Sequence, residues 1–187
     1  MTETKQDKFP TVFWTANVVE LFERAAYYSM ASFVVIYLGQ LGLGAYWPSN
    51  LNSVLWTLVY FLPILAGPFV DRYGFKKSLA ACFAIYAVGY FLIGLSGLPM
   101  GQPLVAAVGT KTWVVCALLI TAIGGSLIKP CIVGTVARTT THETKSLGYS
   151  IYYTLVNVGG WRGPVLAIQV RVSLGIAGRG ARAERNR

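Results

Sequence analysis

The sequence predicts an all-α membrane protein with about five transmembrane helices. Of its 187 residues, 55% are hydrophobic and 12% are charged, whereas about a quarter of the residues are charged in an ordinary soluble domain. The mean hydropathy is +0.54, and residues 25–70 contain no Asp, Glu, Lys or Arg. Because a helix of about 20 apolar residues crosses the hydrocarbon core of a bilayer, these runs indicate a membrane-spanning chain.

Five apolar segments, separated by Gly, Pro and polar residues, define the expected helices. They are residues 12–41, 49–70, 78–98, 112–136 and 147–170. The connectors at residues 39–50 and 97–111 are rich in Gly and Pro, which predicts turns there and not helix. Residues 1–11 precede the bundle and contain no cleavable signal sequence.

The basic residues of the short connectors predict the orientation. The second connector contains Arg72, Lys76 and Lys77, and the fourth contains Arg138 and Lys145. The first connector has no basic residue and the third has only one. The positive-inside rule therefore predicts a multi-pass protein of the cytoplasmic membrane, with residues 1–11 and both basic connectors in the cytoplasm.

Residues 171–187 form a basic tail with five arginines and one glutamate, so they carry 5 − 1 = +4 of the total charge of +9. After five crossings this tail would lie outside, which the positive-inside rule disfavours. We interpret it as a disordered or non-native segment, such as a frameshift or truncation product. The alternative is a natural basic tail that follows four or six helices. Neither interpretation predicts binding to nucleic acid.

Three charges lie inside the first apolar segment, where a membrane helix carries few. Glu20, Glu23 and Arg24 are spaced i, i+3 and i+4, so a helix projects them onto one face. Two carboxylates close together resist simultaneous ionisation, so one of them is expected to bind a proton near neutral pH. The spacing predicts a proton site.

Lys129 is a further charge in an apolar segment, and it lies well inside the fourth expected helix. One interpretation is a lysine that extends to the cytoplasmic surface. The favoured one is a functional partner for Glu20 and Glu23, since ionisable residues within a membrane are functional by default.

The second connector, GPFVDRYGFKK, resembles the loop motif G-x-x-x-D-R-x-G-x-K-K of the major facilitator superfamily. Apart from this resemblance, Gly67 would permit close helix contact, Asp71 and Arg72 could pair, and Gly74 would allow a tight reversal. The residues of this motif are Gly67, Asp71, Arg72, Gly74, Lys76 and Lys77.

The first segment narrows the resemblance to one family. ELFERAAYY, residues 20–28, resembles the signature E-x-x-E-R-F-x-Y-Y of the proton-dependent oligopeptide transporters. Tyr60, the pair Lys129 and Pro130, and Asn157 follow in the family's order. The chain departs from the pattern at Ala25, which replaces a phenylalanine, and at Arg162, a charge in the middle of the fifth segment.

This resemblance implies a fold and a function. The fold is an incomplete N-terminal six-helix bundle at residues 12–170, and the function is proton-coupled symport of di- and tripeptides by alternating access. The resemblance implies proton coupling by Glu20, Glu23, Arg24 and Lys129. It also implies that Arg24, Lys129, Tyr28, Tyr60 and Asn157 bind the peptide. The expected partners are small peptides, lipid and a missing C-terminal bundle, without which transport is not expected.

Two other classes remain open: a major facilitator transporter of nitrate, sugar or drugs, and a non-transporting membrane remnant that binds a partner. The motifs predict no enzyme, metal site or cofactor other than the coupling proton. Cys82, Cys116 and Cys131 lack paired spacing and are interpreted as packing residues, and His142 as a solvated loop residue.

Overall fold

The computed structural model describes residues 8–44 and 46–173. Their regular secondary structure consists of helices, joined by short turns and loops. The helices are α1 (Thr11–Gln40), α2 (Tyr46–Tyr73), α3 (Phe75–Leu95), the 3-10 turn η1 (Pro99–Gly101), α4 (Gln102–Val108), α5 (Thr110–Ser126), α6 (Ile128–Thr139) and α7 (Lys145–Ser173). The predicted N-terminal segment falls largely, and the basic tail almost wholly, outside the described residues.

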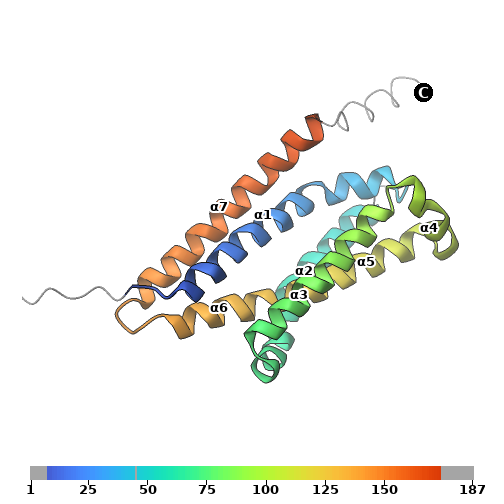
Figure 1. Ribbon diagram of the computed structural model, residues 1–187. Coiled ribbons are helices and arrows are strands. Elements are labelled where there is room, and N and C mark those ends of the chain that lie inside the picture. Colours follow the sequence, from blue (N-terminus) through green and yellow to red (C-terminus); the bar gives the residue numbers. More distant parts are fainter. Residues whose placement is uncertain (1–7, 45, 174–187) are drawn as a thin grey trace, which may run out of the picture.

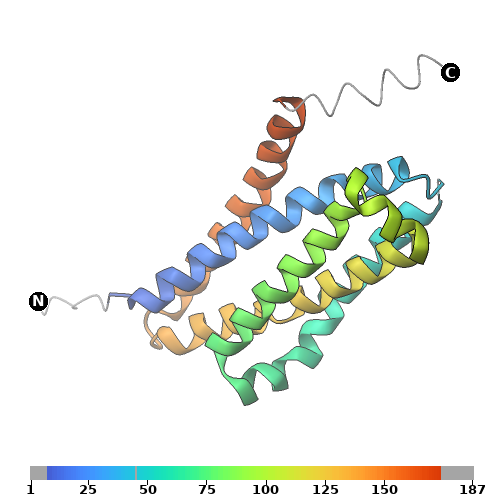
Figure 2. The ribbon, with the colours of Figure 1, turned by 45° about the vertical axis from the view of Figure 1, so that its right-hand side comes forward.

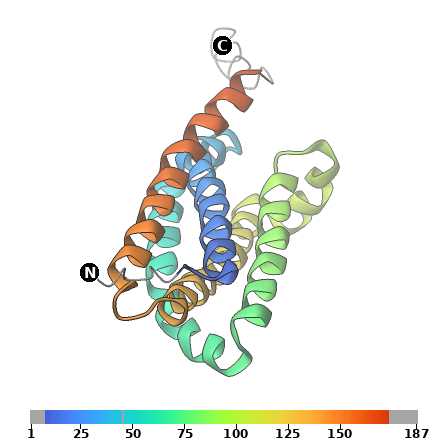
Figure 3. The ribbon, with the colours of Figure 1, turned by 60° about the vertical axis from the view of Figure 1, so that its left-hand side comes forward.

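The long helices form two groups (Figure 1). Helix α7 packs along α1, and α3 packs along α5, while α2 contacts α5 and α1. Figure 3 shows α7 on one side of α1 and the α3 and α5 pair on the other. Helix α6 continues from α5 and reaches both groups, because it contacts α1, α2 and α3. Figure 2 shows α7 diverging from α1 toward its C-terminal end.

Three stretches in the described part of the chain are long and apolar enough to cross a membrane: Tyr46–Tyr73, Phe75–Leu95 and Thr110–Thr139. Helices α1 and α7, with 30 and 29 residues, have a comparable length. At 1.5 Å per residue each is about 45 Å long. The prediction of an all-α membrane protein is therefore confirmed.

The prolines explain where the helices differ from the predicted segments. Helix α2 begins before residue 49 because Pro48 lies in its first turn, where a backbone N–H has no intrahelical partner. The fourth segment is interrupted at Leu127, between α5 and α6. Pro130 has no N–H to donate to the carbonyl group of Ser126, so the helix is broken one turn before this proline.

The prediction of a connector without helix at residues 97–111 is wrong, since this stretch contains η1 and α4. Pro99 begins η1 and Pro103 lies in the first turn of α4. Proline is tolerated at both places because its fixed φ angle suits the start of a helix. Helix α3 accordingly ends at Leu95, three residues earlier than expected.

Two clusters of buried apolar residues make up the core. The first joins the start of α1, which includes Phe13, to α3, α6 and Tyr152 of α7. The second joins the C-terminal half of α1, beginning at Tyr27, to α2 and α5. The stretch of α1 between Phe13 and Tyr27 carries the three charges, so they lie where the two clusters meet.

Candidate functional site

The charged face predicted for the first segment exists on α1 and is buried. Glu20, Glu23 and Arg24 are 1%, 5% and 4% exposed. The Arg24 Nε atom donates to Glu23 Oε2 at 2.5 Å and lies 3.5 Å from Glu20 Oε1. One guanidinium therefore faces two carboxylates inside the bundle. Such a set is stable only when its polar atoms find partners, because isolated buried charges are costly.

Two tyrosines from other helices complete this cluster, and the sequence did not predict either of them. The Tyr86 hydroxyl of α3 donates to Glu23 Oε1 at 2.7 Å, and the Tyr152 hydroxyl of α7 donates to Glu20 Oε1 at 3.4 Å. Both rings are 5% exposed. A buried tyrosine needs a partner for its hydroxyl group, but the sequence has 11 tyrosines and does not show which of them are buried.

Glycines allow these helices to come close enough. A Cβ atom at Gly125 of α5 would lie 2.5 Å from the Tyr86 hydroxyl oxygen. One at Gly159 of α7 would lie 3.0 Å from the Cβ atom of Arg24. Both positions therefore require glycine for the observed packing around the charges.

The two glutamates have different surroundings. Glu23 receives hydrogen bonds from both Arg24 and Tyr86. Glu20 has the longer contacts at Oε1, and its Oε2 atom is buried with no hydrogen-bond partner among the described residues. An unpaired buried carboxylate oxygen is costly, so of the two side chains Glu20 is the one whose free oxygen is suited to carrying a proton.

Lys129, which the sequence predicts as a functional partner of Glu20 and Glu23, lies against an aromatic ring. The described residues show no Lys129 contact to Glu20 or Glu23 within ion-pair distance, and the Nζ atom lies 4.5 Å from the centre of the Tyr60 ring. The break at Leu127 places Lys129 on the first turn of α6, where its side chain stacks on Tyr60 of α2.

An aromatic row links three of the predicted peptide-binding residues. Tyr28 of α1 lies 6.3 Å from the Trp56 ring, which stacks on Tyr60 at 6.0 Å between ring centres. Tyr60 in turn contacts Lys129. Asn157 of α7 is exposed, and its side chain makes no hydrogen bond among the described residues. Gly160, three residues later on α7, packs against the Tyr28 ring.

The loop motif behaves as predicted at one position and not at two others. Gly74 has a φ angle of 80°, which permits the tight reversal between α2 and α3. A Cβ atom at Gly67 would meet nothing within 4 Å among the described residues, so the predicted close contact there is wrong. Asp71 pairs with Arg138 of α6 at 4.0 Å and not with Arg72, whose guanidinium group lies over the Tyr73 ring, 5.7 Å from its centre.

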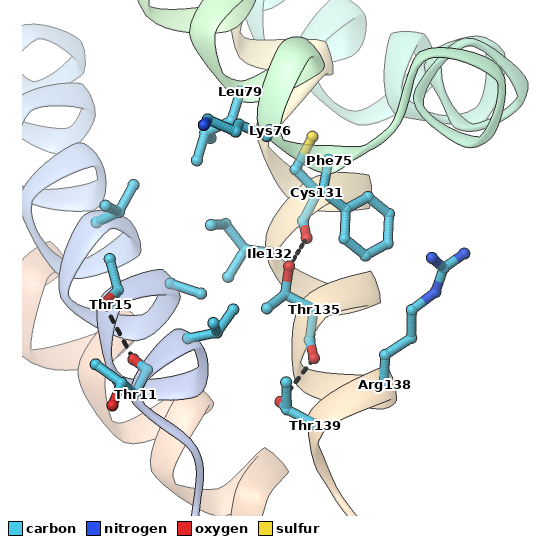
Figure 4. A pocket seen from close by; sticks show the side chains of 13 residues that line it. Thr11, Thr15, Phe75, Lys76, Leu79, Cys131, Ile132, Thr135, Arg138 and Thr139 are labelled. Atoms are coloured by element: carbon cyan, nitrogen blue, oxygen red, sulfur yellow. Dashed lines mark hydrogen bonds between the residues drawn. The ribbon is translucent and has the colours of Figure 1, made fainter.

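Lys76 of the motif and Arg138 of α6 line an apolar cavity of 630 Å3 between α1, α3 and α6. Figure 4 shows Thr11 and Thr15 on one wall of it and Cys131 to Thr139 on the other. A second cavity of 420 Å3 continues along α1 and α3 and reaches Glu23 and Tyr86. The charged cluster therefore borders the second of these cavities.

Arg162, for which the sequence offered no partner, is exposed on α7 and lies over its neighbour Trp161, 5.8 Å from the ring. Ala25, which replaces the expected phenylalanine, lies against α7, where a Cβ atom at Gly163 would be 2.8 Å from its Cα atom. The small side chain at residue 25 thus accompanies the close approach of the two helices.

Comparison with known families settles the classification. The family model described as the POT family matches residues 76–175. The chain belongs to the POT family. It is a multi-pass membrane protein, as its apolar helices indicate.

Curated relatives support this POT assignment. Solute carrier family 15 member 1 of Oryctolagus cuniculus is 26% identical over 183 residues, covering 88% of this chain and 25% of the relative. Peptide transporter family 1 of Drosophila melanogaster is 31% identical over 116 residues, covering 60% and 15%. Dipeptide and tripeptide permease A of Pectobacterium carotovorum is 26% identical over 183 residues, covering 91% and 34%. The chain thus spans only about a sixth to a third of these relatives. No solved structure matches it.

The hydroxyl group of Tyr86 is expected to stabilise the POT chain through Glu23. Tyr86→Phe removes a hydrogen bond to a buried carboxylate and should lower the free energy of unfolding by about 1–2 kcal/mol. Titration of the purified chain from dodecyl maltoside into sodium dodecyl sulfate, followed by circular dichroism, measures this loss.

The matched control is Tyr90→Phe. Tyr90 stacks on Tyr86 at 5.4 Å between ring centres, and its hydroxyl makes no hydrogen bond among the described residues. Equal losses of unfolding free energy in the two variants would show that the hydrogen bond from Tyr86 to Glu23 does not stabilise the chain.

Proposed function

We propose that this chain forms the N-terminal part of a proton-coupled symporter of di- and tripeptides. The observation that carries the proposal is the buried set of Glu20, Glu23 and Arg24 in the middle of an apolar bundle. A soluble or purely structural helix gains little from such a set, because replacing a buried ion pair by apolar residues is often neutral or stabilising. The presence of these three charges inside a membrane segment favours a role in ion transport.

Glu20 is the proposed proton carrier and Glu23 the fixed partner of Arg24. The proton on Glu20 would remove one of the two negative charges that face Arg24. Among the described residues no hydrogen bond occupies the terminal nitrogens of Arg24, which could then bind the C-terminal carboxylate of a peptide. Protonation and binding of a carboxylate would thereby favour each other at the same guanidinium group.

The remaining proposed site residues would form the wall of the peptide site. Tyr28, Tyr60 and Asn157 offer hydroxyl and amide groups that suit peptide backbones of any sequence, and Lys129 offers a second cation at the end of the aromatic row. The opposite wall would come from a second bundle, since transporter sites of this kind lie between repeats. The partners are therefore small peptides, lipid and that second bundle.

The proposed location is the cytoplasmic membrane, with the N-terminus in the cytoplasm. Arg138 and Asp71 approach each other, and Lys76 lines the same cavity as Arg138. The basic residues of the second and fourth connectors thus lie at one end of the bundle, as the positive-inside rule requires for a cytoplasmic face.

Uptake of a labelled dipeptide into proteoliposomes tests the proposal. Because the chain spans a small part of its relatives, residues 8–173 replace the matching part of dipeptide and tripeptide permease A of Pectobacterium carotovorum. We expect an inward proton gradient to drive uptake by this hybrid. Glu20→Gln should abolish the dependence on the gradient, because its amide binds no proton.

Glu143→Gln is the matched control, since Glu143 is an exposed loop carboxylate, and it should leave gradient-driven uptake unchanged. Gradient-driven uptake that survives both Glu20→Gln and Glu23→Gln would exclude these carboxylates as the proton site.

A further inference from the structure

The short helix α4 lies outside the proposed transport site, at the end of the α3 and α5 pair that is far from the Asp71 to Lys77 loop (Figure 1). Helix α3 has 21 residues and is therefore about 31 Å long, which matches the hydrocarbon thickness of a bilayer. The chain that follows it, from Ser96 onward, consequently reaches the level of the lipid headgroups.

The C-terminal carbonyl groups of α3 are capped by side chains. Trp113 Nε1 donates to the Leu92 carbonyl at 2.9 Å, Tyr37 Oη to Ile93 at 2.9 Å, and Gln102 Nε2 to Ser96 at 3.0 Å. Helix-end carbonyls at a soluble surface are commonly satisfied by water. Tyrosine and tryptophan are enriched at membrane interfaces, where one side of the ring is apolar and the other is wet.

The outward face of α4 is apolar. Leu104 and Val108 of α4 are spaced i and i+4 and are 55% and 52% exposed, Met100 of the preceding turn η1 is 75% exposed, and Val105 is buried against the bundle. The polar side chain of α4, Gln102, is used internally on Ser96. No charged residue occurs from residue 78 to residue 110, so the exposed apolar residues of α3, such as Phe91, are followed by those of this face with no charge between them.

The placement of α4 is fixed and does not depend on a flexible linker. A Cβ atom at Gly101 would overlap the Leu95 carbonyl oxygen and lie 2.7 Å from Leu95 Cγ, so η1 packs directly on the end of α3. The first charge after α4 is Lys111, whose Nζ atom lies 4.9 Å from the centre of the Trp47 ring. This pair is typical of the headgroup region.

We propose that α4 is an interfacial helix that lies in the plane of the membrane, with the stripe of Met100, Leu104 and Val108 inserted into the boundary between lipid headgroups and acyl chains. The partner is the lipid surface itself, because the stripe continues the lipid-facing side of α3 and bears no polar group. Apolar faces of such helices enter the boundary by about 5–10 Å. The helix would hold the α3 and α5 hairpin at a fixed depth in the bilayer.

Spin labels on single cysteines test this placement in the full chain reconstituted into phosphatidylcholine liposomes. Cys116→Ser removes the exposed native cysteine, while Cys82 and Cys131 are buried. Labels are attached at Leu104→Cys on the stripe and at Ala106→Cys on the opposite side of α4. Collision rates with oxygen, which dissolves in lipid, and with a water-soluble nickel chelate are then compared.

We expect oxygen collisions to dominate at residue 104 and nickel collisions at residue 106. A label at Phe91→Cys, on the 64% exposed Phe91 of α3, shows that the protein is inserted, because oxygen must dominate there. Nickel collisions that dominate at residue 104 would place α4 in water and overturn the proposal. Exclusion of both reagents from residue 104 would show that protein covers the stripe, which overturns it equally.

Discussion

Arg24→Met is expected to destabilise the chain by about 3–5 kcal/mol, because it leaves two buried carboxylates without their cation. Methionine preserves most of the volume of the arginine side chain, so the loss is one of charge pairing and not of packing. Glu20 and Glu23 are both within 4 Å of Arg24 Nε, and neither has another cation within ion-pair distance among the described residues. The midpoint of unfolding in sodium dodecyl sulfate, followed by circular dichroism, measures the effect.

Two controls test whether the loss of stability in Arg24→Met comes from the unpaired carboxylates. Arg138→Met removes an arginine from an exposed pair, in which the side chains of Arg138 and Asp71 are 72% and 74% exposed, and should cost less than about 1 kcal/mol. Adding Glu20→Gln and Glu23→Gln to Arg24→Met removes the unpaired charges and should restore most of the stability. A triple variant as unstable as Arg24→Met would show that the arginine acts through packing and not through the two carboxylates.

The sequence predicted the charged face of α1 because helical spacing alone determines which residues share a face. Glu20, Glu23 and Arg24 needed no knowledge of the other helices. Tyr86 and Tyr152 could not be predicted, because their role depends on the packing of α3 and α7 against α1. For the same reason, the contact of Lys129 with the Tyr60 ring could not be predicted: the break at Leu127 and the position of Tyr60 determine where its side chain lies. Its role as a functional partner of Glu20 and Glu23 stays a prediction.

Composition predicted the membrane class, whereas local backbone chemistry determined the ends of the helices. A stretch with Pro99, Gly101 and Pro103 is typical of a turn, yet prolines near a helix start are compatible with η1 and α4. At Gly67 the motif predicted a close helix contact, but no neighbouring atom lies near this glycine among the described residues. Close contacts with α1 lie at glycines of α7, and which of its glycines face α1 depends on the crossing of the two helices.

The double substitution Gly159→Ala and Gly163→Ala is expected to separate α7 from α1. A Cβ atom at residue 163 would overlap the Ala25 carbonyl oxygen and lie 2.8 Å from Ala25 Cα, and one at residue 159 would lie 2.5 Å from the Leu21 carbonyl oxygen. These contacts are with helix backbone, so no side chain can move aside to relieve them. Small residues spaced four apart allow transmembrane helices to pack at such short distances.

We expect this double variant to lose about 2–4 kcal/mol of unfolding free energy. Overpacking against backbone costs about 2–3 kcal/mol per site, the upper part of the usual range, and the greater helix propensity of alanine returns about 1 kcal/mol per site. The same titration in sodium dodecyl sulfate measures it. Gly94→Ala is the matched control, since a Cβ atom there meets nothing within 4 Å among the described residues, and it should be neutral or stabilising.

Because Tyr152 reaches Glu20 from α7, displacement of this helix would also remove a donor from the carboxylate that we propose to carry the proton. Unchanged stability of the double variant would mean that α7 does not pack against α1 at these glycines, and the contact between Tyr152 and Glu20 would lose its structural basis.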